Sequence, residues 1–553
     1  MSLYKIMNKK ILVITLSSIL FCPVINAAKY DVLMERNKVD GKLFHDFNGS
    51  FDDAMLYRGG EDKYKIIINY LHNKQYAEAD KKLTELLYKH PNDPKLYGLK
   101  GLLEIKKNKI KGAREIFLKV IDLDQKNISA YRALANIEIT NGKLNLAKGY
   151  FNKILAINDK YILAYYSLAA IAEKQNETQQ VERYLSKGYQ KSLGNVGFEI
   201  KMAGMLAKWY EKQNQPMKAL VLAENVIKKY PMHKHAILLL VNAQMLNGKS
   251  DVSEGILQKI IALDKKEVRF RLLLANIISK DLSREKEVIM LLDEVSDIIP
   301  GSETPEVLKA SFYLKGKKYK KSLQVIGDIK KKYPHSSAAY QIEGDIFYGE
   351  KKWEKALVAY KKAYQFQSSD KLLQVVVSLM LQVSTIDDAV KFLNNELKNN
   401  NNNTSVNLHL ARVFLQQKKI EQAKQYYEKV LAIQSGNVEA LNDLALIYAE
   451  EGNVKAIVLA KKAYSLAIMS SVVADTYGYV LTKHGEYNEA IGVLRKAVEL
   501  DGESVVIQLH LAEAYVLNNE NQQAVKLLRR ILESEGSGSD KVKITKMLKK
   551  LTI

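Results

Sequence analysis

Residues 340–363 read YQIEGDIFYGEKKWEKALVAYKKA, and this stretch contains a pattern that returns along most of the chain. An aromatic residue stands at Tyr340, a small residue at Gly344, a second small residue at Ala356 and a large one at Tyr360. We call the residue in the Ala356 position the ladder residue. A fixed period of a few tens of residues predicts a stack of similar structural units, each packed on its neighbours, rather than one globular domain.

The ladder residue recurs at steps of 34, apart from single steps of 38 and 35 and two of 33. Its positions are Ala79, Ala113, Ala147, Val181, Ala219, Ser253, Glu287, Ser322, Ala356, Ala389, Ala423, Ala456, Ala490 and Ala524. The 38-residue step inserts four residues near Leu193–Val196, and the sequence predicts helix pairs there with a less regular register. The chain is far longer than one ordinary domain, which a solenoid tolerates because each unit contacts only its neighbours.

Residue types at fixed distances from the ladder predict a pair of antiparallel helices. Turn formers stand five positions before it, at Asn108, Gly142, Gly248, Gly485 and Asn519. Small residues such as Gly101 and Ala135 stand twelve before it, and large residues such as Phe117 and Phe151 four after it. We expect the two small residues to face each other where the helices cross, and the large residues to fill the space between hairpins. Proline then ends the second helix at Pro91, Pro231 and Pro334.

This pattern resembles the tetratricopeptide (TPR) repeat, W-x2-L-G-x2-Y followed by A, F and P. The resemblance implies an all-α fold, a right-handed α-solenoid of about 14 repeats with a C-terminal capping helix. We predict repeats over residues 61–192, divergent repeats over 193–325 and further repeats over 326–535.

The N-terminus has the pattern of a processing segment. Lys5, Lys9 and Lys10 precede an apolar run of eleven residues, Ile11–Phe21, and Ile25-Asn26-Ala27 forms a cleavage site. We interpret residues 1–27 as a cleavable signal peptide that directs the chain to the periplasm; the alternative is a short uncleaved anchor. Residues 28–60 carry no repeat and are expected to form an irregular lead-in.

Cys22 is the only cysteine in the chain. A lipoprotein would be cleaved before such a residue and acylated on it, and the chain would then be an outer-membrane lipoprotein attached to the membrane at Cys22. Phe21 stands where a lipobox needs a small residue, which weakens this alternative. Cleavage after Ala27 would leave no cysteine, as suits an oxidising compartment without a disulfide framework.

Two polar segments predict breaks in the helical pattern. Residues 399–403 are all asparagine, which favours a solvent-exposed loop between repeats. Residues 536–539, Gly-Ser-Gly-Ser, form a flexible link, after which Asp540 can cap a final helix over residues 540–553.

The formal net charge is +22, and removal of residues 1–27 leaves +19. Such a charge concerns partners rather than fold. Export argues against nucleic acid, so a generally solvated basic surface and contact with an anionic polysaccharide, peptidoglycan or lipid remain as alternatives.

No catalytic or cofactor motif is present in the sequence. The nine histidines are scattered, and His233 and His235 have a spacing that suits neither one helical face nor a common zinc site. No H-E-x-x-H, P-loop or G-x-S-x-G motif occurs. We therefore predict a non-catalytic protein with no cofactor and no metal.

Binding residues are predicted from the repeat phase. In a TPR array the first helices line the inner groove, and groove positions fall three before and one after the small residue of the first helix. The predicted groove residues are Arg132, Asn136, Tyr166, Lys208, Asn242, Asn276, Gln341, Asp345, Arg412 and Asn442. Leu408 is an apolar exception. Asn and Arg side chains in such positions hydrogen-bond well to peptide backbones and sugar hydroxyls.

A second resemblance concerns the cellular role. Ala440–Tyr448 reads ALNDLALIY and Asp475–Leu481 reads DTYGYVL, similar to segments common in long bacterial envelope TPR proteins. Together with the leader, the chain resembles the exported exopolysaccharide-associated TPR proteins of the PEP-CTERM system. That resemblance implies a periplasmic scaffold that binds envelope proteins in polysaccharide assembly or export; the alternative is direct binding of an anionic polysaccharide or peptidoglycan through the basic surface.

Overall fold

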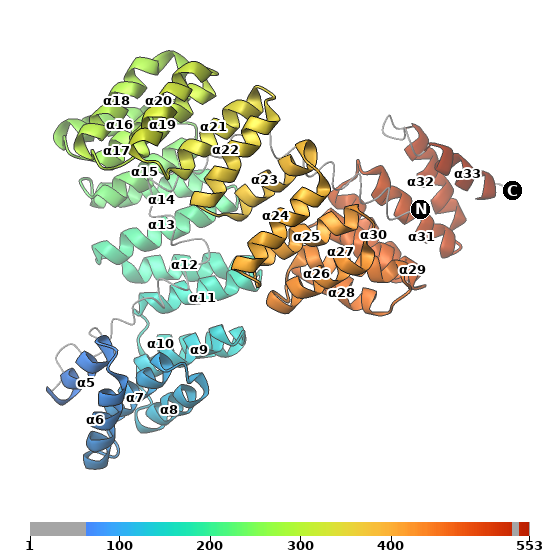
Figure 1. Ribbon diagram of the computed structural model, residues 1–553. Helices are drawn as coiled ribbons and strands as arrows, with labels where there is room; N and C mark the ends of the chain where they lie inside the picture. Colours follow the sequence, from blue (N-terminus) through green and yellow to red (C-terminus); the bar gives the residue numbers. More distant parts are fainter. Residues whose placement is uncertain (1–61, 534–540, 552–553) are drawn as a thin grey trace. The chain divides into compact units, whose positions relative to one another are not determined.

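The computed structural model describes residues 62–533 and 541–551, which form 29 α-helices, one 3-10 helix and no strand (Figure 1). The predicted signal peptide, Cys22, the lead-in over residues 28–60, the 536–539 link and the cap at Asp540 lie outside these described residues. Within the described range, no helix is both long enough and apolar enough to span a bilayer.

The helices divide into two compact units, and the boundary in the chain lies between Ser302 and Glu303. The first unit contains α5 (Asp62–His72), α6 (Tyr76–Lys89), α7 (Pro94–Lys106), α8 (Ile110–Leu123), α9 (Ile128–Thr140), α10 (Leu144–Ile157), α11 (Ile162–Lys174), α12 (Thr178–Ser192), α13 (Val196–Lys212), α14 (Pro216–Lys229), α15 (Lys234–Leu246), α16 (Ser250–Leu263), α17 (Val268–Ile278), η2 (Leu282–Arg284) and α18 (Glu285–Ile298). The second contains α19 (Thr304–Lys315), α20 (Tyr319–Lys332), α21 (Ser337–Gly349), α22 (Trp353–Phe366), α23 (Asp370–Val383), α24 (Ile386–Asn399), α25 (Thr404–Gln416), α26 (Ile420–Ile433), α27 (Val438–Glu450), α28 (Lys455–Leu466), α29 (Ser471–Lys483), α30 (Tyr487–Leu500), α31 (Val505–Leu517), α32 (Asn521–Glu533) and α33 (Lys541–Leu551).

Helices α5 to α32 form 14 consecutive hairpins, each a first helix with an odd label and a second helix with an even label. The ladder residues lie near the start of the second helices, and all except Glu287 are buried, as Ala113, Ala356 and Ala490 illustrate with no exposed surface. The predicted all-α solenoid of TPR-like hairpins is therefore confirmed.

One ladder position was wrong by a residue. Glu287 is exposed, and its neighbour Val288 is buried in its place. The turn before α18 is a 3-10 helix, η2, whereas most other hairpins have a single left-handed residue there, so the register of α18 is shifted by one. The step from Ser253 to the buried position is consequently 35 residues.

The small residue of the first helix contacts the large residue of the second helix. The ladder residue also packs at this position, since the Ser322 hydroxyl donates a 2.8 Å hydrogen bond to the carbonyl of Ala310, twelve residues before it. A Cβ added to Gly101 would lie 2.7 Å from the Phe117 ring, and one on Gly344 would lie 2.8 Å from the Tyr360 ring. At Gly478 the same atom would lie 2.4 Å from Leu494 Cγ. Each hairpin therefore closes with a large side chain seated on a nearly bare backbone, and this contact lies inside the hairpin rather than between hairpins.

Local sequence explains how each helix begins. The predicted turn formers Asn108, Gly142, Gly248, Gly485 and Asn519 all have positive φ, which lets the chain reverse within one residue. First helices begin instead with a side-chain cap in many hairpins: Asp93 accepts hydrogen bonds from the amides of Lys95 and Leu96, and Asn127 accepts one from Ala130.

The four inserted residues near Leu193–Val196 are absorbed by longer helices. α12 has 15 residues and α13 has 17, whereas α11 has 13. Gly194 adopts φ +87° between them, and the caps and core continue on both sides. The insertion therefore lengthens two helices of neighbouring hairpins and does not interrupt the stack within this unit.

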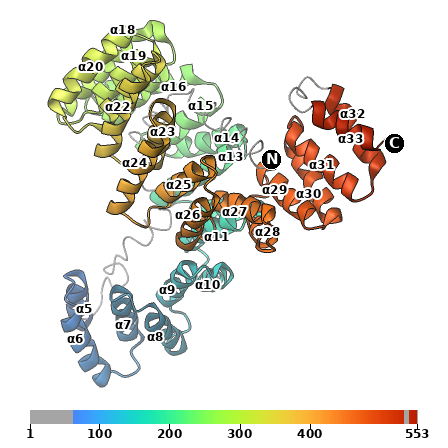
Figure 2. The same ribbon diagram turned by 45° about the vertical axis from the view of Figure 1, so that its right-hand side comes forward.

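First helices of neighbouring hairpins also contact one another. Substantial contacts join α5 to α7, α13 to α15, α19 to α21, α23 to α25, α27 to α29 and α29 to α31, and no two second helices among the described residues make comparable contacts. Closer packing on the first-helix side makes it the inner face of each stretch of hairpins, and the second helices form the outer face. Figure 2 shows hairpins α25–α26, α27–α28 and α29–α30 following one another along the chain. At the C-terminal end α33 packs through Ile544 on Leu509 and Leu528.

Candidate functional site

All ten predicted groove residues lie on first helices, in α9, α11, α13, α15, α17, α21, α25 and α27. Lys208 is exposed, Tyr166 and Asn442 are buried, and the others are half-buried. The prediction that they bind a ligand stays a prediction.

Several of these side chains contact other residues of the array. The Arg132 guanidinium donates a 3.3 Å hydrogen bond to the Tyr161 hydroxyl, and the Gln341 amide donates a 3.1 Å hydrogen bond to the Ser337 hydroxyl. Asp345 accepts a hydrogen bond from the Tyr360 hydroxyl, the same side chain that packs on Gly344. These polar side chains of the first helices are therefore partly exposed to solvent and also hold neighbouring side chains of the array in place.

Arg412 and Asn442 come together in one polar cluster on α25, α26 and α27. Arg412 forms an ion pair with Glu439, and the Asn442 amide donates a 3.2 Å hydrogen bond to the Asp443 carboxylate. The Tyr427 hydroxyl donates a 2.8 Å hydrogen bond to the other Asp443 oxygen. We call these five residues the Arg412 cluster.

The cluster has more negative than positive groups, in a partly desolvated place. Burial raises the pKa of Glu439, an effect that the Arg412 charge opposes and the Asp443 charge reinforces. Burial also raises the pKa of Tyr427 well above its ordinary value, and the nearby Asp443 carboxylate raises it further. One cation facing two carboxylates suits a ligand that brings a hydrogen-bond donor or a positive charge.

A second polar group lies further along the same face, on α27, α29 and α31. His510 Nδ1 and Asp475 Oδ1 are 2.7 Å apart, both side chains are buried, and the Tyr479 ring lies against the imidazole at 4.9 Å between centroids. Tyr479 also donates a hydrogen bond from its hydroxyl to Glu450.

Sequence reasoning missed most of these partners. Asp475 and Tyr479 stand three before and one after Gly478, so the groove rule applied to that repeat would have found them. Glu439 and Glu450 stand at other positions of their helices and contact groove residues of neighbouring hairpins, which the phase of one repeat does not reveal.

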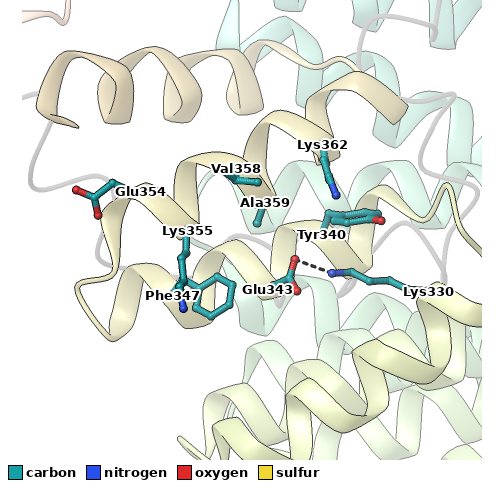
Figure 3. A pocket seen from close by; sticks show the side chains of 9 residues that line it. All are labelled: Lys330, Tyr340, Glu343, Phe347, Glu354, Lys355, Val358, Ala359 and Lys362. Carbon is teal, nitrogen blue, oxygen red and sulfur yellow. Dashed lines mark ion pairs between the residues drawn. The ribbon is translucent and has the colours of Figure 1, made fainter. Parts of the chain in front are cut away.

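A cleft of about 490 Å³ is lined by residues of the hairpin α21–α22 and by Lys330 of α20 (Figure 3). Tyr340 and Phe347 supply aromatic surface, with Lys330 Nζ 4.1 Å and Lys362 Nζ 5.5 Å from the centre of the Tyr340 ring. Lys355 Nζ lies 5.8 Å from the Phe347 ring centre, and Lys330 forms a 2.6 Å ion pair with Glu343.

Two lysines of this cleft, Lys355 and Lys362, stand at positions that recur in other hairpins. A lysine directly before the ladder residue lies over an aromatic ring of the same hairpin in four places: Lys218 on Tyr210, Lys321 on Tyr313, Lys355 on Phe347 and Lys455 on Tyr448. A basic residue also stands six after the ladder in nine hairpins, at Lys119, Lys153, Lys187, Lys259, Lys362, Lys429, Lys462, Lys496 and Arg530. All of these except the half-buried Lys496 are exposed on second helices.

Within residues 62–533 and 541–551 no group of three or more His, Cys, Asp and Glu side chains is arranged to hold a metal ion. His233 and His235 lie beside each other, with ring centroids 5.6 Å apart.

Comparisons with known proteins identify the repeat. Tetratricopeptide repeat models match residues 94–127 and 404–437, residues 205–231, and residues 481–540. No curated protein matches the chain.

Similar solved structures include the APC/C hetero-tetramer Cut9–Hcn1, at 13% identity and a TM-score of 0.36, covering 88% of this chain and 95% of that chain. Naa15/Naa10 bound to HypK-THB has 10% identity and a TM-score of 0.34, covering 89% of this chain and 96% of that chain. Yeast Tom70 has 12% identity and a TM-score of 0.36, covering 80% of this chain and 99% of that chain. Similarity at this level says nothing about partners.

The matched segments fall in both units, on hairpins that carry the buried ladder residues. The chain therefore contains tetratricopeptide repeats.

Proposed function

We propose that the protein is a non-catalytic scaffold that binds protein partners along its first-helix face, in an envelope complex for exopolysaccharide assembly or export. TPR arrays of this kind serve protein interaction, because a stack of helices offers an extended inner surface. The observation that carries the binding part is the Arg412 cluster, a set of polar groups from consecutive hairpins on that face in which Arg412 and Glu439 are partly exposed and Tyr427 and Asn442 are buried.

The location and the pathway rest on sequence features alone. The leader over residues 1–27 supports export, and the resemblance to exported TPR proteins supports both export and a role in the envelope. Fractionation of cells that produce the tagged chain tests this part: recovery in the periplasmic or outer-membrane fraction is expected, and exclusive recovery in the cytosol would contradict it.

Partner binding is tested by affinity capture from envelope extracts. Arg412→Ala and Asn442→Ala should reduce recovery of specific envelope proteins, because they remove donors from the proposed groove. Lys153→Ala on the outer helix α10 serves as a matched control and should capture the same proteins as the unaltered chain. Equal capture by all three variants would show that the partners bind elsewhere.

A second function, direct binding of an anionic polysaccharide, is favoured by the cleft at Tyr340. Aromatic surface with nearby ammonium groups suits a sugar ring that carries a carboxylate. Lys355→Gln with Lys362→Gln should weaken co-sedimentation with an acidic polysaccharide, and raising the salt concentration should weaken it in the unaltered chain. Binding that survives high salt would count against this charge-driven site.

A further inference from the structure

The segment from α28 to the start of α29 exposes more apolar surface than any comparable stretch of the described chain. Six large apolar residues in nineteen positions are exposed: Val454, Val458, Leu466, Ile468, Met469 and Val472. Exposed fractions reach 68% at Val458 and 72% at Met469, so these side chains project from the surface. Contiguous exposure of this kind marks an interaction site rather than scattered surface residues.

Lysines accompany these residues and acids do not. Lys455, Lys461 and Lys462 are exposed, and no Asp or Glu stands between Glu451 and Asp475. Within residues 62–533 and 541–551 none of the three forms an ion pair. At about 100° per residue, Lys461, Val454, Val458 and Lys462 share one arc of α28 opposite the buried ladder residue.

The loop that follows α28 exposes two large apolar residues. After some other second helices this loop carries polar residues, such as Asp124–Asn127 and Asp264–Glu267, whose first residues cap their own turn, and after α14 it exposes one large apolar residue, Met232. After α28 the loop is Ala467-Ile468-Met469-Ser470. The Ala467 carbonyl accepts a hydrogen bond from the Ser470 amide, and the Ser470 hydroxyl accepts one from the Val473 amide. Ile468 and Met469 contribute little to the core, so the repeat fold does not account for them.

We propose that this surface, which we call the α28 patch, docks the protein on an anionic lipid bilayer. Projecting apolar side chains at a loop tip can enter the headgroup region, and lysines around them can reach lipid phosphates with their ammonium groups. A peptide partner needs a groove, and the patch is a projection on the outer face. The docking is peripheral, and it requires neither Cys22 acylation nor the proposed scaffold role.

The test uses sedimentation with vesicles of phosphatidylglycerol and phosphatidylcholine in equal parts. The chain from Ala28 onward is used, which keeps every described helix and removes the apolar leader. It should sediment with these vesicles and far less with pure phosphatidylcholine. Lys461→Glu with Lys462→Glu should lower the partition coefficient at least tenfold, since each surface lysine contributes roughly fivefold.

Ile468→Ser with Met469→Ser should lower the partition coefficient about tenfold at both low and high salt, because it removes the inserted groups. Met290→Ser is the matched control, since Met290 is exposed on second helix α18 among acidic residues, and it should bind as the unaltered chain does. Circular dichroism checks that each variant keeps its helical content.

Several results would overturn the proposal: no sedimentation of the unaltered chain with anionic vesicles, or both patch variants binding as tightly as the control. Self-association that the patch variants abolish, with no vesicle binding, would assign the surface to a second copy of the chain instead. Capture of a protein through the patch without lipid binding would likewise reject the bilayer.

Discussion

At the scale of single residues, hairpin closure depends on bare backbone at a few points. Gly478 lies under Leu494, and an added Cβ would sit 2.4 Å from Leu494 Cγ. We expect Gly478→Ala to lower the free energy of unfolding by about 1–3 kcal/mol through overpacking. Gly492, in the paired helix α30, has open space around it. Gly492→Ala should therefore stabilise by about 0.5–1 kcal/mol. Urea unfolding followed by circular dichroism compares them, and equal effects would reject the packing account.

The left-handed residues before the second helices offer a second test. Lysine occupies this position at Lys74, Lys317, Lys351 and Lys418, with φ near +60°. A side chain in this conformation costs about 1–2 kcal/mol, which glycine avoids. Lys351→Gly should raise the unfolding midpoint, and Gly485→Ala, the reverse change at an equivalent position, should lower it. Opposite shifts would contradict the assigned turn.

Acid sensitivity is expected from His409 on α25. Burial, followed by the Arg412 charge, lowers the pKa of His409 to about 4, and Asp370 opposes this. The unfolded chain has an ordinary histidine pKa near 6.5 and binds the proton first as pH falls. The folded state therefore loses up to about 3 kcal/mol between pH 6.5 and 4. His409→Gln should flatten this dependence in unfolding curves at several pH values, whereas His72→Gln on the exposed surface of α5 should not.

At the scale of elements, neighbouring first helices are coupled by buried polar pairs. Asp475 on α29 and His510 on α31 form one such pair, and substitution of either residue removes a hydrogen bond from the other buried side chain. Each single alanine substitution should cost about 2–3 kcal/mol, and the double variant should cost less than their sum. A double-mutant cycle measures the coupling, and strict additivity would show that the pair does not link the helices.

The elements also show how far the sequence could predict the structure. Hairpin positions followed from the ladder because a residue at each helix crossing must be small and buried. The prediction of a buried residue at Glu287 was wrong because η2 replaces a one-residue turn and shifts the helix by one position. Nothing in the amino-acid composition of this segment indicates that shift. The asparagine tract is a shorter loop than its composition indicated, since Asn399 ends α24 and Asn403 caps α25. The polar clusters combine residues of different hairpins. Their partners could therefore be identified only from the way in which neighbouring hairpins pack.

At the scale of the whole molecule, stability is expected to be local. Each hairpin packs on its neighbours, and each unit contains its own buried clusters, so a unit should fold without the other. A fragment over residues 303–553 is therefore expected to be helical and to unfold cooperatively. A fragment that begins at Tyr319 lacks α19 and leaves Ile326 and Ile329 of α20 without their partner Val307.

Comparison of these two fragments tests whether a unit is stable without the other unit. The shorter fragment should lose its first hairpin and unfold at lower urea concentration, because a terminal second helix without its first helix exposes a buried face. Circular dichroism and limited proteolysis report both properties, with cleavage expected inside α20 of the shorter fragment alone. An unfolded 303–553 fragment would mean that stability is shared along the entire array, and that the boundary at Ser302 has no energetic meaning.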